Sequence, residues 1–74
     1  GLLNIDSEID RLIKERKKVE EAMSFIDRKL QNDDFLKRAP EDVVKKEKAK
    51  YDELAAKRER IDENIRKFKD VKSA

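Results

Sequence analysis

The residues of this chain that could do chemistry are its carboxylates, its lysines and arginines, Tyr51 and a few serines. Histidine and cysteine are absent, which removes the commonest general base, the commonest metal ligand and the most reactive nucleophile. Asp33 with Asp34, and Glu41 with Asp42, could loosely hold a divalent cation, but the spacing and central glycine of a calcium loop are missing. We therefore expect no catalytic residue, no metal site and no cofactor.

The basic residues offer a different chemistry, because they can bind phosphate groups. The chain holds 20 basic and 18 acidic residues, a net charge of +2, so attraction to nucleic acid would have to come from local patches. Residues 27–50 carry eight basic residues against six acidic ones, and such side chains can reach the backbone of folded RNA. A solvated charged face is the structural alternative for the same residues. The residues that we predict to bind RNA are Arg28, Lys29, Lys37, Arg38, Lys45, Lys46 and Lys48.

Two amphipathic stretches must position these side chains. Written as heptads with inward positions a and d, the first stretch is apolar at eight of nine inward positions and the second at six of eight. With about nine non-periodic residues between them, they predict an all-α fold, an antiparallel two-helix coiled-coil hairpin with helices over about 5–31 and 40–70. The inward positions are Leu2, Ile5, Ile9, Leu12, Arg16, Val19, Met23, Ile26 and Leu30, then Val44, Glu47, Tyr51, Leu54, Arg58, Ile61, Ile65 and Phe68.

Local signals mark the ends of both helices. Asn4 can cap the first helix, and Pro40 suits the first position of the second, where its missing N–H is not needed. Proline also moves Ala39 out of the helical region. The segment between the helices, "LQNDDFLKRAP", contains Phe35. We expect its ring to fold back over the helix ends beside the turn and cover the apolar residues there. Stacking on an RNA base is the alternative. We expect fraying beyond Phe68, because a two-helix arm is marginally stable.

Two arginines interrupt the apolar stripes. Arg16 and Arg58 occupy a positions, where a polar side chain can fix the register of a helix pair at some cost in stability. We expect each side chain to lie across the seam and to send its guanidinium to an acid such as Glu15, Glu20 or Asp62. Direct contact with RNA is the alternative.

Three apolar residues fall outside the stripes, namely Ile13, Phe25 and Val43. Scattered surface hydrophobes are normal, yet the same residues could contact another body. A protein-interaction or oligomerisation coiled coil with no RNA role, including weak self-association of the chain, therefore stays open as a second function.

The overall composition limits the class of protein. Charged residues make up 51% of the chain, about twice the usual fraction of about 25%, as in long helices and coiled coils. No apolar run approaches the roughly 20 residues that span a bilayer, and no signal or transit peptide is visible. Charges that alternate in sign argue against a membrane-surface helix. We expect a soluble, cytoplasmic chain with no membrane partner.

The segment "KLQNDDFLKRAPEDVVKKEKAKY" resembles the turn of the C-terminal coiled-coil arm of bacterial-type valyl-tRNA synthetases. The opening "GLLNIDSEIDRLIKE" is similar to the segment that leads into the first helix of that arm. Departures from the family pattern are Asn4, Leu36, Arg38 and Tyr51, all compatible with packing, although Arg38 changes the geometry of a phosphate contact. The matching residues are Gly1, Leu2, Glu8 and Leu12, then Leu30, Asn32, Phe35, Ala39, Pro40, Val43, Val44 and Glu47.

The resemblance implies that residues 1–74 form one arm domain of a larger class I ligase. In that family the arm lies along the outer corner of tRNA, where the D and T loops meet, and steadies the tRNA while distant domains activate valine and edit errors. The implied partners are valine tRNA and the body of the parent synthetase. The arm itself would carry no catalytic group.

Overall fold

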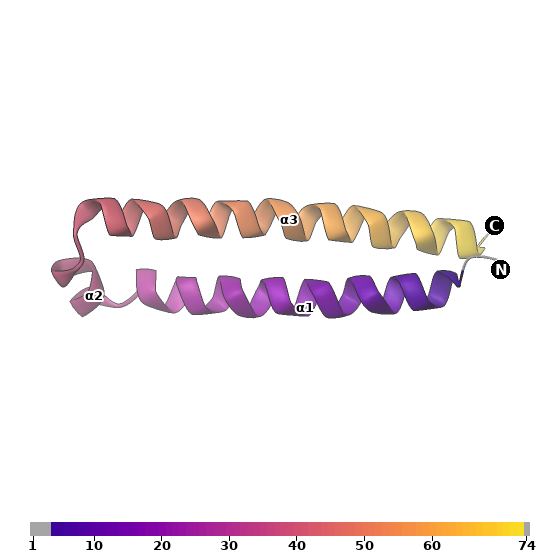
Figure 1. Ribbon diagram of the computed structural model, residues 1–74, viewed down its shortest axis with the longest axis horizontal. Helices are drawn as coiled ribbons and strands as arrows, with labels where there is room; N and C mark the ends of the chain where they lie inside the picture. Colours follow the sequence, from indigo (N-terminus) through magenta and orange to yellow (C-terminus); the bar gives the residue numbers. More distant parts are fainter. Residues whose placement is uncertain (1–3, 74) are drawn as a thin grey trace.

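The computed structural model describes residues 4–73, and these residues form three helices and no strand. The long helices are α1, Ile5–Leu30, and α3, Glu41–Ser73, and the short helix α2, Asp33–Arg38, lies between them. α1 and α3 lie side by side as a hairpin, with the start of α1 and the end of α3 at the same end of the molecule (Figure 1). The molecule measures 54 × 18 × 14 Å.

The predicted all-α class and the two long helices are confirmed, with two differences. The segment predicted to be a turn contains α2, Asp33–Arg38. A six-residue helix is too short to display a hydrophobic period, so periodicity could not reveal it. The second helix also runs to Ser73, beyond the predicted end near residue 70. Lys72, in this added part, forms an ion pair with Asp6 at the start of α1.

Asparagine side chains cap the first two helices. The Asn4 side chain accepts a hydrogen bond from the Ser7 N–H at 3.2 Å, as predicted. Asn32 Oδ1 accepts from the N–H groups of Asp34 and Phe35, at 3.0 and 3.2 Å. Each cap satisfies backbone donors that have no partner within the helix. Acidic residues in the first turns and basic residues in the last turns of the helices further match the helix dipoles.

The Ala39–Pro40 step separates α2 from α3. Ala39 has extended backbone angles, φ −74° and ψ 138°, as expected of a residue before proline. The Pro40 carbonyl accepts from the N–H groups of Val43 and Val44, at 3.0 and 3.2 Å. Pro40 therefore stands directly before the first residue of α3, one place earlier than predicted.

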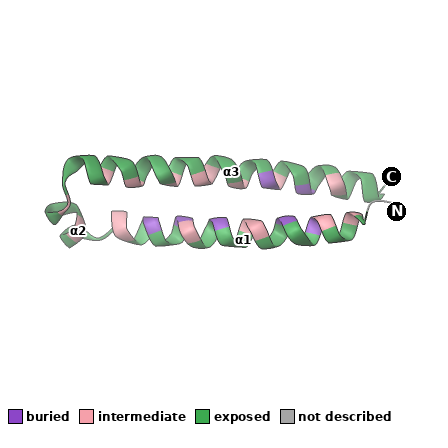
Figure 2. Cartoon of the chain, in the orientation of Figure 1, coloured by how far each residue is buried: buried purple, intermediate pink, exposed green. Residues whose placement is uncertain are grey.

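The buried residues follow the predicted stripes. Every inward position within residues 4–73 is buried or half-buried, and Leu2 lies outside the described residues. In Figure 2 the buried positions lie on the sides of α1 and α3 that face each other. Because each helix buries only one stripe, the core is a thin seam between them. The buried core residues are Ile9, Leu12, Val19, Met23, Ile26, Ile61 and Ile65.

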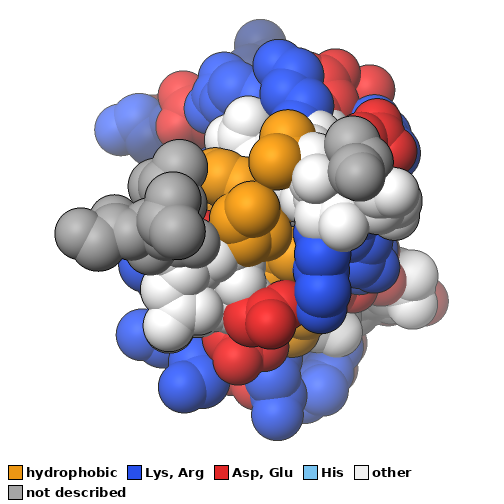
Figure 3. All heavy atoms as spheres, turned by 90° about the vertical axis from the view of Figure 1, so that its right-hand side faces the viewer, with side chains coloured by type: hydrophobic (Ala, Val, Ile, Leu, Met, Phe, Trp, Pro, Cys, Tyr) orange, Lys and Arg blue, Asp and Glu red, His pale blue; other side chains and the backbone are white. Residues whose placement is uncertain are grey.

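Viewed from the end that holds the start of α1, apolar side chains lie in the middle of the molecule and charged side chains surround them (Figure 3). Phe35 is half-buried, and it lies in α2 rather than in a loop. Ile13, Phe25 and Val43 are exposed, at 47%, 60% and 38%. None of the described helices combines the length and the apolar character that a membrane crossing would need.

Candidate nucleic-acid interface

Three of the predicted RNA-binding residues stand exposed around the closed end of the hairpin. Lys37 and Arg38 form the last turn of α2, and Arg28 lies in the last turn of α1. Asn32 caps the start of α2, and α2 in turn positions Lys37 and Arg38. Among the described residues, none of the three cations forms an ion pair with a carboxylate. Their charges are therefore available to an anionic partner.

Lys29 is less available than the sequence suggested. Its Nζ lies 3.7 Å from a carboxylate oxygen of Glu47 on α3. The same ammonium group lies 4.6 Å from the centre of the Phe25 ring, within the range of a cation–π interaction. Lys29 is half-buried as a result. It ties α1 to α3 near the closed end, so binding RNA would require it to leave both contacts.

The three predicted lysines at the start of α3 are all exposed. Lys45 forms an ion pair with Glu41 at 3.6 Å, in which both side chains are mostly in solvent; such pairs contribute little to stability. Within residues 4–73, Lys46 and Lys48 form no ion pair. Lys45 and Lys48, three positions apart, lie on one face of α3, whereas Lys46 points about 100° away from Lys45 to another face.

A cluster of four charged side chains lies at the middle of the arm. Arg16 Nε is 2.9 Å from Asp62 Oδ1 and 3.4 Å from Glu20 Oε1, and Arg58 is 3.9 Å from Glu20. The prediction that both arginines reach acids beside the seam is confirmed. Arg16 Nε is enclosed but has no acceptor in line with its N–H bond, so its contact with Asp62 is an ion pair without an aligned hydrogen bond.

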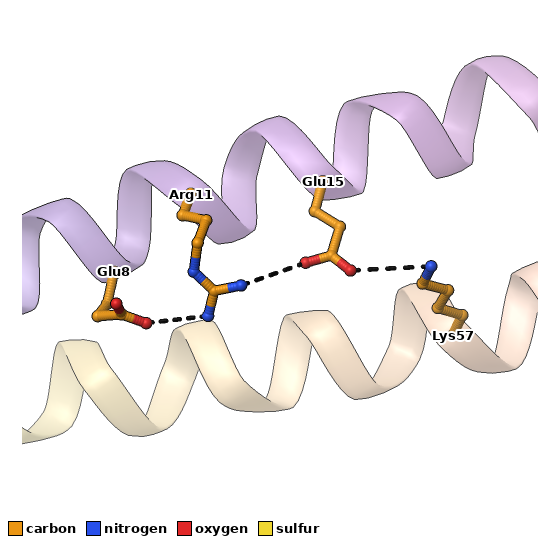
Figure 4. Close-up of polar contacts among 4 residues, drawn as sticks. All are labelled: Glu8, Arg11, Glu15 and Lys57. Carbon is orange, nitrogen blue, oxygen red and sulfur yellow. Dashed lines mark hydrogen bonds and ion pairs between the residues drawn. The ribbon is translucent and has the colours of Figure 1, made fainter.

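A second set of ion pairs, which the sequence analysis missed, runs along the other side of the seam (Figure 4). Arg11 contacts Glu8 at 2.9 Å and Glu15 at 3.7 Å, and Lys57 of α3 contacts Glu15 at 3.8 Å. The pKa of Arg11 is raised, chiefly by its hydrogen bond to Glu8 and next by the negative charge of the Glu8 carboxylate. Glu15 and Lys57 both occupy heptad position g, a signal that could have predicted their contact.

An ion pair between residues far apart in the sequence joins the start of α1 to the end of α3 at the open end of the hairpin. Lys72 Nζ donates a hydrogen bond to Asp6 Oδ1 at 2.6 Å. The pKa of Lys72 is raised, chiefly by this hydrogen bond and next by the negative charge of the Asp6 carboxylate. Both side chains are largely exposed, so salt will screen the attraction.

Within the part of the chain that the structure describes, no group of three or more acidic side chains is arranged to hold a metal ion. Asp33, Asp34, Glu41 and Asp42 instead lie in the first turns of α2 and α3, where carboxylates stabilise a helix through its dipole.

The family model and the similar proteins point to the same family. Residues 4–69 match the family model described as the valyl tRNA synthetase tRNA binding arm. Similar proteins include the valine–tRNA ligase of Desulfotalea psychrophila, which is 48% identical over 63 residues. Those of Geobacter sulfurreducens and Bacillus subtilis are each 38% identical over 69 residues.

These alignments cover 85%, 93% and 93% of the chain, but only 7%, 8% and 8% of the relatives' lengths. The chain therefore corresponds to a small part of each ligase. No solved structure matches it significantly.

Proposed function

Because this chain belongs to the valyl-tRNA synthetase tRNA-binding arm family, we propose that it contacts the backbone of valine tRNA at its outer corner and steadies it while other domains act. On this proposal, residues 1–74 are one arm domain of a larger synthetase, whose body supplies valine activation and editing. The family is a non-catalytic, appended part of ligases, so the contribution of the arm is binding and orientation.

The observation that carries this proposal is the set of exposed cations at the closed end of a stiff arm. Arg28, Lys37, Arg38, Lys46 and Lys48 are exposed, and side chains of this kind bind phosphates without reading base sequence. With a longest dimension of 54 Å, the arm can hold them far from its point of attachment. Lys29 and Lys45 complete the proposed set, once they leave Glu47 and Glu41.

We further propose that α1 and α3 form an antiparallel coiled coil. Four of the five ion pairs between the described parts of α1 and α3 support it, because in these four the partner's number falls as the residue number on α1 rises. Asp6 pairs with Lys72, Arg16 with Asp62, Glu20 with Arg58, and Lys29 with Glu47. The inward positions repeat every 3.5 residues on average, which is the spacing of a left-handed supercoil.

A filter-binding titration with valine tRNA tests the RNA-binding proposal. The chain should bind with an affinity that falls as salt rises, with a log–log slope of roughly −0.7 to −0.9 per phosphate contact. Lys45→Glu/Lys46→Glu should weaken binding several-fold. The matched control is Lys17→Glu/Lys69→Glu, which makes the same change in charge at exposed residues outside the proposed set. No binding by the wild-type chain at moderate salt would contradict the proposal.

A second candidate function rests on exposed apolar side chains. Phe25, Ile13 and Val43 are 60%, 47% and 38% exposed, which would suit self-association or a protein partner. Sedimentation velocity over a hundredfold range of concentration tests self-association. Concentration-dependent dimers that Phe25→Ser abolishes would favour this second function. A monomer at all concentrations that binds tRNA would favour the RNA-binding function.

A further inference from the structure

The two flanks of the hairpin differ in charge. Glu15 on α1 and Lys57 on α3 both occupy heptad position g and form an ion pair, so the g positions of the two helices lie on the same side of the seam. The c positions are next to the g positions on a helix surface. We call the c and g positions of α1 and α3 the basic flank. The b and e positions form the opposite flank, which includes Glu20 and Asp62 of the cluster at the middle of the arm.

The basic flank carries eight basic residues against three acidic ones, a local charge of +5, whereas the opposite flank carries five against eight, a charge of −3. The charged residues of the basic flank are Arg11, Lys18, Lys29, Lys46, Lys50, Lys57, Arg60 and Lys67, with Glu8, Glu15 and Glu53. Those of the opposite flank are Lys17, Lys45, Lys48, Arg66 and Lys69, with Asp6, Asp10, Glu20, Asp27, Glu41, Asp52, Glu59 and Asp62.

Ion pairing leaves most of the cations of the basic flank available. Lys29, Arg11 and Lys57 are paired with carboxylates. The others are exposed and form no ion pair within the described part of the chain; they are Lys18, Lys46, Lys50, Arg60 and Lys67. Lys46 and Lys67, the outermost of the four on α3, are 21 positions apart, which is about 32 Å along the helix axis.

A shallow hollow lies on this flank of α3. It is lined by Lys50, Lys57 and Arg60, together with Glu53, Leu54 and Ala56. Ala56 leaves room between the longer side chains, so the three cations surround a depression in which only one acid lies. The hollow on the other side of α3 is lined by three acids, Asp52, Glu59 and Asp62, with Arg58 and Arg66. The hollow on α1 is lined by Glu20 and Glu21 with Lys17 and Arg28, so in neither hollow do cations outnumber acids.

We infer that the basic flank is the face on which the tRNA backbone lies, so that the binding surface runs along α3 from Lys46 to Lys67 and is not confined to the closed end of the hairpin. This inference rests on the proposed function. A row of cations on one straight helix matches a continuous run of phosphates. Away from the closed end, where Lys45 and Lys48 of the proposed set lie, the opposite flank is negative, repels phosphate and so determines which side of the arm faces the RNA.

Two triple variants test the inference in the 74-residue chain. The flank variant is Lys50→Gln/Arg60→Gln/Lys67→Gln. The matched control is Lys17→Gln/Arg66→Gln/Lys69→Gln, which removes two lysines and one arginine, all exposed and without an ion pair in the described residues, from the opposite flank. Circular dichroism checks that both variants keep the helical content of the wild type. Filter binding to valine tRNA at several salt concentrations gives the affinity and the salt slope.

The flank variant should bind about tenfold more weakly or worse, and its log–log salt slope should be shallower by roughly 2 to 3, since three phosphate contacts are lost. The control should lose less than about twofold, with an unchanged slope. Equal losses in both variants, or no loss in the flank variant, would overturn the inference and leave the proposed function intact. If the wild-type chain itself fails to bind tRNA, the proposed function and the inference fail together.

Discussion

Arg16 and Asp62, 46 positions apart in the sequence, meet at the middle of the arm, with Nε and Oδ1 2.9 Å apart. Arg16 stands where the apolar stripe of α1 is interrupted, between the buried Leu12 and Val19. A slip of α3 by one heptad would remove Asp62 from this place and leave a half-buried guanidinium with fewer partners. The pair therefore favours one register over its neighbours.

We expect Asp62→Asn to lower the free energy of unfolding by about 0.5–1 kcal/mol, because the pair is partly exposed and screened by solvent. That change corresponds to a melting temperature lower by about 3–6 °C for a domain of this size. Thermal melts followed by circular dichroism measure it. Asp70→Asn, at an exposed residue, is the control. An equal shift in both variants would show that Asp62 acts only through the net charge of the chain and not through its pair with Arg16.

The thin core should make single truncations costly. Leu12 is 5% exposed and packs with Ile9, Ile61 and Ile65 in the buried cluster. Leu12→Ala should cost about 2–4 kcal/mol through lost burial and a cavity. The neighbouring Ile13 is 47% exposed, so Ile13→Ala should cost less than about 0.5 kcal/mol. Urea unfolding compares the two. Similar midpoints would contradict the assignment of the seam.

Removal of the Asn32 cap should loosen the closed end of the arm. Its side chain accepts from two backbone N–H groups, and replacing such a cap by alanine costs about 1 kcal/mol. Asn32→Ala should therefore speed amide hydrogen exchange within α2 about fivefold, with little change in α1. Gln31→Ala is the control, because within residues 4–73 the Gln31 side chain hydrogen-bonds Asp27 and no residue of α2. Unchanged exchange in α2 would show that the cap is dispensable.

The Lys72–Asp6 contact predicts a dependence on alkaline pH. The pKa of Lys72 is raised above its ordinary value of 10.5, chiefly by the hydrogen bond to Asp6. Its stabilisation is thus fully present below pH 10.5 and is lost as the pH rises through the raised value.

Wild type should melt about 1–3 °C above Lys72→Gln at pH 8, since the pair is exposed. This difference should close as the pH rises through the raised pKa of Lys72. Lys69→Gln, which removes a charge from an exposed residue, controls for net charge. A difference that persists at high pH would mean that packing of the Lys72 stem, not its charge, stabilises this end.

The locally encoded features were predictable. The inward positions from Ile5 to Phe68, the Asn4 cap and the extended Ala39 all depend on residues a few places apart in the chain, where periodicity and capping act. The arginines at a positions could also be assigned, because a guanidinium in a seam has to reach an acid beside it. Helix α2 was missed because its one strong signal, the Asn32 cap, stands before a segment of only six residues.

By itself the sequence determined that two long amphipathic helices exist and where they begin. It also determined that basic residues are frequent near the segment that joins them. Only the tertiary structure decided which cations are neutralised: Lys29 by Glu47, Lys57 by Glu15, and Lys72 by Asp6. These partners are 18 to 66 positions apart, and they meet only after the hairpin closes in one register. Closure also gathers charges of one sign on one side, because the flank that a residue joins depends on how its helix is turned toward the other.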